Sequence, residues 1–226
     1  MRHFAEELEE LKQALLEMGA LVESSIHTAV LALVERDDRL ARRVVEDESL
    51  INKMELDLDA RVTRLLALNQ PVAGDLRLLV MCLKINTDLE RMGDLAVSVA
   101  QRAISLNALS EEVVLPMGQP LIDITRMAGL VEDMIHRTLD AFVKRDSELA
   151  SAVLPADDDV DRLRDGVYKE LITIMRNEPT LVDAAVHVMF ISRSLERVAD
   201  HATNIAEDVI YLVRGVDVRH HATEEI

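Results

Sequence analysis

Apolar residues recur at steps of three and four along most of the chain, which is the spacing that places side chains on one face of an α-helix. A polar break at 35–38 ends the first run. Pro71 ends the second, because proline disfavours the helical conformation at the residue before it. A third run covers about 75–106. Each run predicts a helix of about 30 residues, on the order of 45 Å long. The first apolar stripe consists of Phe4, Leu8, Leu11, Leu15, Met18, Val22, Ile26, Ala29 and Leu33.

The same pattern returns after the segment from Pro116 to Pro120, which we take as the boundary between two units, 1–112 and 113–226. A second proline interruption, at Pro179, occupies the place in this half that Pro71 has in the first. The predicted helices cover about 120–144, 147–177 and 181–214, and a polar tail at 215–226, with His220 and His221, is expected to fray.

Specific polar residues recur together with the apolar pattern. The segment Met18–His27 matches Met127–His136 at an offset of 109, and Leu89–Asp94 matches Leu195–Asp200 at an offset of 106. Two amphipathic helices share Leu and Val by chance, but chance does not account for matched Glu, Arg, Asp and His. The sequence therefore predicts an all-α protein made of two tandem three-helix bundles related by internal duplication.

Composition agrees with a helical protein and excludes several classes. Of 226 residues, 49% are hydrophobic and 2% aromatic, with 7 Gly and 5 Pro, which favours helix over sheet. The single cysteine, Cys82, excludes a disulfide scaffold, fits a reducing cytoplasm and is expected to be a buried, inert thiol. No stretch approaches about 18 uncharged apolar residues, so no membrane span is expected. A net charge of −17 argues against a nucleic-acid partner.

Pairs of carboxylates recur at helical spacing in both halves. Glu90 and Asp94 are four apart, as are Glu196 and Asp200, so each pair shares one helix face. Oxygen ligands without cysteine favour Mg²⁺, Mn²⁺, Ca²⁺ or iron and make zinc the least favoured cation. We therefore predict metal at these carboxylates. The preceding helix of each half adds oxygen-bearing side chains with the same spacing, which are Glu48 and Asn52, and Asp157 and Asp161.

Solvated, salt-bridged carboxylates are the competing interpretation. Arg91 lies three residues from Asp94, and Arg193 lies three residues from Glu196, so exposed ion pairs are available on both helices. The acids at 157–161 also suit the first turn of a helix, where the helix dipole favours negative charge. Recurrence in both halves favours metal, and both interpretations stay open at this point.

The histidines give a weaker signal than the carboxylates. His27 and His136 match across the halves, but a di-iron bundle of the ferritin type needs histidine three residues after glutamate, and no histidine here has that spacing. We expect both to be structural or interfacial. His201, beside Asp200, is a better candidate ligand, although its counterpart is Leu95. Nucleophile motifs and glycine-rich phosphate loops are missing, so no enzymatic activity is expected.

The two motifs that hold these carboxylates resemble those of the PhoU family, bacterial regulators associated with high-affinity phosphate uptake. They read Leu89-Glu90-Arg91-Met92-Gly93-Asp94 and Leu195-Glu196-Arg197-Val198-Ala199-Asp200. Residues 36–44 and 70–77 also resemble segments of this family. The resemblance implies two three-helix bundles, usually dimeric, with metal held by the carboxylates of both motifs and Asn204 following in the second.

The resemblance further implies a cytoplasmic, non-enzymatic negative regulator of phosphate uptake and of the phosphate-starvation regulon. Its expected partners are the ATPase subunit of the phosphate ABC transporter and a phosphate-sensing membrane histidine kinase. The chain departs from the repeat at Ser98 and Gln101, and Arg164 replaces the acid found at Glu55, so the two metal patches need not be equal. A carboxylate-bridged metalloenzyme and a metal-free helical scaffold are the alternatives.

Overall fold

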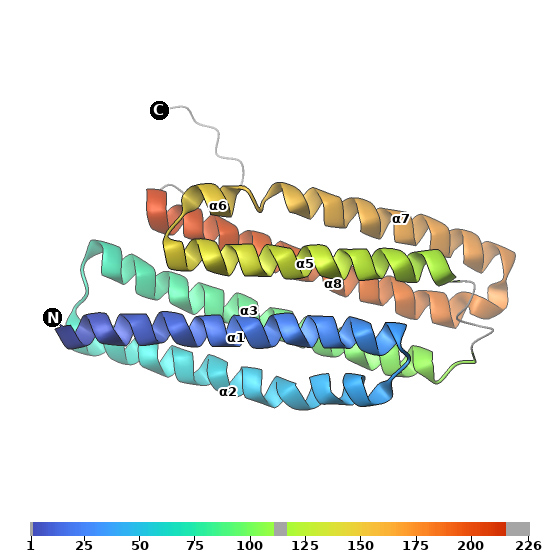
Figure 1. The fold of residues 1–226 in the computed structure, drawn as a ribbon, viewed down its shortest axis with the longest axis horizontal. Coiled ribbons are helices and arrows are strands. Elements are labelled where there is room, and N and C mark those ends of the chain that lie inside the picture. The colour runs from blue at the N-terminus through green and yellow to red at the C-terminus, as the bar shows by residue number, and fades with distance from the viewer. Residues whose placement is uncertain (1, 111–116, 216–226) are drawn as a thin grey trace.

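The computed structural model describes residues 2–110 and 117–215, and these contain helices and no strand (Figure 1). The helices of the first half are α1 (Arg2–Val34), α2 (Asp38–Asn69) and α3 (Ala73–Asn107). Those of the second half are α5 (Gly118–Lys144), α6 (Ser147–Ser151), α7 (Pro155–Asn177), the short 3₁₀ helix η2 (Pro179–Leu181) and α8 (Val182–Arg214).

The two bundles lie side by side along their length, with α3 packed on α8 and α1 packed on α5 (Figure 1). The predicted apolar stripes form the core: Leu15, Met18 and Val22 on α1 are fully buried, as are Leu79 and Met92 on α3. Aliphatic side chains and methionine fill this core almost without aromatic rings, as the composition indicated. The prediction of an all-α protein of two three-helix bundles is confirmed.

The internal duplication extends to the backbone of the loops. Arg36 and Arg145, which are equivalent at the offset of 109, both adopt positive φ, 53° and 51°. The next residue in each case, Asp37 or Asp146, caps the following helix by accepting hydrogen bonds from backbone N–H groups of its first turn. The Arg-Asp dipeptide therefore sets the same tight turn in both halves.

The middle helix of the second half differs from the prediction. A continuous helix was expected over 147–177, but α6 ends at Ser151 and α7 begins at Pro155. Proline has no backbone N–H to donate within a helix, and its ring clashes with the carbonyl four residues before it, here that of Ser151. Leu154, just before the proline, keeps helical dihedral angles of φ −52° and ψ −42°. The equivalent residue of the first half is Glu46, which leaves α2 unbroken.

Two predictions concern residues that the structure does not describe. The boundary between residues 112 and 113, with Pro116, and the tail containing His220 and His221 lie outside the described ranges. The exact domain limits therefore stay predictions.

The expectation that no segment crosses a membrane also stays a prediction. Helix α1 meets the length and composition test for a span, because residues 18–34 contain a single Asp, Glu, Lys or Arg, which is Glu23. Half of the apolar window is buried inside the bundle, which is also the arrangement of a core helix in a globular protein.

Candidate metal centre

The first acidic patch consists of Glu48, Asn52 and Glu55 on α2 and Glu90 and Asp94 on α3. Burial raises the pKa of Glu90, and the negative charges of Asp94, Glu55 and Glu48 add to that rise. Three carboxylates are therefore close enough to Glu90 to repel its negative charge. Asn52 is exposed on α2, one turn after Glu48. The structure thus brings the predicted acids of the first half together and adds Glu55.

Arg91, on the same helix as Glu90 and Asp94, contacts both acids. Arg91 lies 3.4 Å from Glu90 Oε2 through its Nε atom and donates from Nη1 to Asp94 Oδ2 at 3.2 Å. Its side chain is 57% exposed, so water screens both contacts. Arg91 flanks the first acidic patch without neutralising it.

Close packing of α3 on α2 holds this patch in place. Gly93 lies between the two motif acids, and a Cβ atom there would approach Ile51 Cδ1 to 3.0 Å. One turn before Glu90, buried Asn86 donates from Nδ2 to the Glu55 carbonyl at 3.0 Å and to Asp59 Oδ1 at 2.9 Å. The Asn86 Oδ1 atom is also buried and has no hydrogen-bond partner. The two helices that carry the acids are therefore joined both by packing and by an amide.

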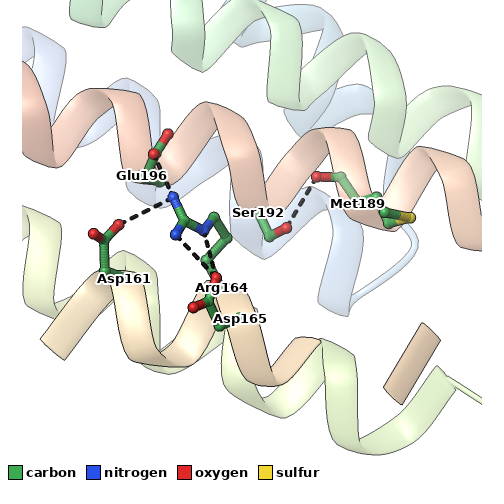
Figure 2. A network of polar contacts seen from close by, with 6 residues as sticks. All are labelled: Asp161, Arg164, Asp165, Met189, Ser192 and Glu196. Atoms are coloured by element: carbon green, nitrogen blue, oxygen red, sulfur yellow. Dashed lines mark hydrogen bonds and ion pairs between the residues drawn. The ribbon is translucent and has the colours of Figure 1, made fainter. Parts of the chain in front are cut away.

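The second acidic patch consists of Asp157, Asp161, Glu196 and Asp200. A partly buried arginine, Arg164, lies beside these acids. Arg164 on α7 donates from Nη1 to Glu196 Oε1 on α8 at 2.6 Å and lies 3.1 Å from Asp161 Oδ1. It also donates to its neighbour Asp165. Figure 2 shows the Arg164 guanidinium between Asp161 and Glu196. Because only 23% of the Arg164 side chain is exposed, this contact is shielded more than that of Arg91.

The arginine does not neutralise the whole second patch. Burial raises the pKa of Asp157 to about 6, with further rises from Asp200 and Asp161. Burial likewise raises the pKa of Asp200, with Asp161 adding to it. Burial and Asp200 raise the pKa of Glu196, although Arg164 opposes the rise. The predicted acids of the second half are therefore also brought together.

The last predicted ligand, Asn204, follows the second patch on the same helix. Asn204 is exposed on α8, one turn after Asp200, and none of the described contacts joins it to the carboxylates.

A polar cavity of about 500 Å³ opens beside the second patch. Its lining includes two more arginines, and the full set is Arg164, Asp165, Tyr168, Arg193, Glu196, Arg197 and Asp200.

Within the described ranges, no three His, Cys, Asp or Glu side chains are placed to hold a metal ion as they stand. Metal at either patch would need carboxylates to turn toward a shared cation. Cys82 is buried, and burial raises the pKa of its thiol to about 12, so the prediction of an inert thiol agrees with the structure.

The paired histidines lie where the halves meet. His27 Nδ1 on α1 is 3.3 Å from Glu132 Oε1 on α5, and His136 Nδ1 on α5 is 3.9 Å from Glu23 Oε1 on α1. This placement agrees with the expectation that they are interfacial. His201 Nδ1 lies 2.8 Å from Asp88 Oδ1 on α3, so that ring also joins the halves.

Sequence reasoning missed two features of this region. It recorded Arg164 as a departure from the repeat but did not predict its contacts with both helices; an arginine aligned with Glu55 was the available signal. It did not predict the Asn86 amide, because nothing in the spacing distinguishes a buried asparagine from an exposed one.

The chain matches the family model described as the PhoU domain twice, over residues 15–103 and 124–209. A phosphate-specific transport system accessory protein PhoU homolog from Pseudomonas aeruginosa is 43% identical over 219 residues, which cover 97% of this chain and 88% of that protein. The homolog from Aquifex aeolicus is 39% identical, covering 97% and 96% of the two chains.

Solved structures agree with these sequence matches. The crystal structure of PhoU from Pseudomonas aeruginosa superposes with a TM-score of 0.87 at 41% identity, covering 94% of this chain and all of that one. The phosphate transport system regulatory protein PhoU from Streptococcus pneumoniae gives 0.83 at 30% identity, with 95% and 99% coverage. Matches of this length in sequence and in fold, in both repeats, show that the chain belongs to the PhoU family.

Proposed function

We propose that the chain is an accessory protein of a phosphate transport system that represses phosphate uptake and the phosphate-starvation regulon when phosphate is plentiful. The observation that carries this proposal is the nearly full-length match to proteins named as accessory to phosphate-specific transport. The expected partners are the ATPase subunit of the phosphate ABC transporter and a membrane histidine kinase. The proposed location is the cytoplasm, where both partners could be contacted, and the proposed assembly is a homodimer.

Metal at the first acidic patch is part of this proposal. Four carboxylates from two helices supply the oxygen ligands that Mn²⁺, Mg²⁺ or iron prefer, and the unpaired Asn86 Oδ1 atom lies on the same helix, one turn from Glu90. A bound cation would supply positive charge between acids that otherwise repel one another. Glu55, Glu90 and Asp94 would turn to share it, which would hold α2 and α3 in fixed register.

The chemistry of the cavity favours a regulator over an enzyme. Its lining holds arginines, carboxylates and one tyrosine, and Arg164 already engages Glu196, so this carboxylate is not free to act as a base. Turnover of a phosphate ester by metal-loaded protein, abolished by Asp200→Ala, would establish the metalloenzyme alternative. A thermal midpoint that ignores both chelator and Mn²⁺ would establish the metal-free scaffold.

Deletion in the host tests the regulatory role. Loss of the chain should raise expression of phosphate-uptake genes in phosphate-rich medium, and the plasmid-borne chain should restore repression. A Cys82→Ser chain serves as a control, because Cys82 is a buried residue that belongs to neither patch. This chain is expected to restore repression fully. Unchanged expression after deletion would overturn the proposal. Copurification of the tagged chain with the transporter ATPase subunit tests the partner directly.

A further inference from the structure

The internal duplication places a positive charge in one patch where the other has a negative charge. At the offset of 109, Glu55 of α2 corresponds to Arg164 of α7. Both side chains are partly buried and lie beside the first acid of their motif, Glu90 or Glu196. The position that would give the second patch a further ligand therefore gives it a guanidinium.

Arg164 also removes ligands that are already present. Its Nη1 atom bonds Glu196 at 2.6 Å and lies 3.1 Å from Asp161, so one guanidinium holds a carboxylate from each helix (Figure 2). Only Asp157 and Asp200 stay outside these contacts. These two carboxylates would leave most of the about six ligand positions of a hard cation to water.

We propose that Arg164 is the permanent cation of the second acidic patch and excludes metal from it. A guanidinium keeps its charge at every physiological pH, and its fork matches carboxylates on two sides. A metal ion entering the patch would have to break both contacts and would then face the guanidinium charge at close range. Helices α7 and α8 are thus joined by a side chain of the protein, without regard to metal supply.

The contrast between the halves rests on the proposed metal site of the first patch, whereas exclusion by Arg164 stands on the second patch alone. If both hold, the first half responds to metal and the second does not. The protein would then combine a metal-dependent bundle with a metal-independent one, and a change in metal supply would act on α2 and α3 only.

Manganese content tests the proposal. Full-length protein stripped by chelator is equilibrated with Mn²⁺ and desalted, and Mn per chain is measured by mass spectrometry. We expect Glu196→Ala with Asp200→Ala to leave the Mn content unchanged. Arg164→Glu replaces the guanidinium by an acid at the position of Glu55 and should add about one Mn²⁺ per chain. Arg193→Glu is the matched control, because it makes the same charge change in the lining of the same cavity and should add none.

Loss of Mn²⁺ on substituting Glu196 and Asp200 in the otherwise unchanged chain would overturn the proposal, and this arm does not depend on the folding of an Arg164 variant. An Arg164→Glu chain that is folded by circular dichroism yet gains no Mn²⁺ would also overturn it. Glu90→Ala with Asp94→Ala reports on the first patch: retention of Mn²⁺ there would refute the proposed metal site and leave the Arg164 arms to decide the rest.

Discussion

The two acidic patches share three carboxylate positions, which are Glu48 with Asp157, Glu90 with Glu196, and Asp94 with Asp200, and they differ in the charge placed beside them. In the first, Glu48, Glu55 and Asp94 lie close enough to Glu90 to repel it, and the arginine that contacts this patch, Arg91, is exposed. In the second, Arg164 lies between the carboxylates of two helices. A duplicated motif therefore need not preserve a duplicated property, because one side chain on the neighbouring helix changes the charge of the whole patch.

Two further positions near the patches differ between the two halves. Asn86 joins α3 to α2 by two hydrogen bonds, whereas its counterpart Ser192 donates to the Met189 carbonyl on its own helix (Figure 2). Tyr168 occupies the position of Asp59, the side chain that receives one Asn86 bond. The first half therefore joins its helices near the patch through an amide, and the second joins them through Arg164.

Metal should change the stability of the first half most. Mn²⁺ at about 100 times its Kd would stabilise a folded binding site by about 2.7 kcal/mol, which corresponds to a rise of roughly 5–10 °C in the thermal midpoint of a chain of this size. Glu90→Ala with Asp94→Ala should abolish the rise, and Glu196→Ala with Asp200→Ala should keep it. Calorimetry with and without chelator measures both. If each of the two double variants lost the rise in thermal midpoint, both patches would contribute to Mn²⁺ binding and the two halves would not differ.

Removal of the resident cation should have the next largest effect. Arg164→Ala leaves Glu196 and Asp161 without their shared partner in a half-buried place, and we expect a loss of about 2 kcal/mol in the free energy of unfolding. Denaturant titration of metal-free protein measures it. An Arg164→Lys chain should recover only part of the loss, since an ammonium lacks the planar fork. Full stability of Arg164→Ala would show that the contacts do not hold α7 to α8.

Asp157, one of the two acids of the second patch that Arg164 does not contact, should be destabilising when ionised. The folded state raises the pKa of Asp157 from 3.8 to about 6, so it binds the proton more tightly than the unfolded chain does. Stability from this group is present below pH 4 and is lost as the pH rises through about 6. Asp157→Asn should therefore stabilise metal-free protein at pH 7 by about 1 kcal/mol, a value reduced for solvent screening.

The gain in stability from Asp157→Asn should disappear as the pH falls to about 4. Thermal midpoints measured between pH 4 and 8 would test this. Asp158→Asn is the matched control on the exposed side of the same turn and should change little. A loss of stability at pH 7 in Asp157→Asn would indicate that this carboxylate has a favourable partner in the folded protein.

The arginine of the first patch should matter least. Arg91 is 57% exposed and its two ion pairs are with residues of its own helix, so Arg91→Gln should change the free energy of unfolding by less than about 0.5 kcal/mol. A loss as large as that expected for Arg164→Ala would show that the two arginines have equivalent roles in their patches.

The sequence predicts the helices and the shared faces of the acids because both follow from a period of 3.6 residues. It recognised Pro71 and Pro179 as interruptions but not Pro155, because the apolar pattern continues through that residue while the backbone does not. Which atoms meet is set by packing between helices distant in sequence. The bonds of Arg164 to Glu196 and of Asn86 to Asp59 are of this kind, so periodicity placed them on the right faces without identifying the contacts.

An anomalous difference map from crystals of the chain grown with Mn²⁺ would show whether metal occupies the first patch and is excluded from the second. We predict a peak among Glu55, Glu90 and Asp94 and none between Glu196 and Asp200, where the Arg164 guanidinium lies. Peaks of equal height at both patches, or a peak at the second patch alone, would contradict the account.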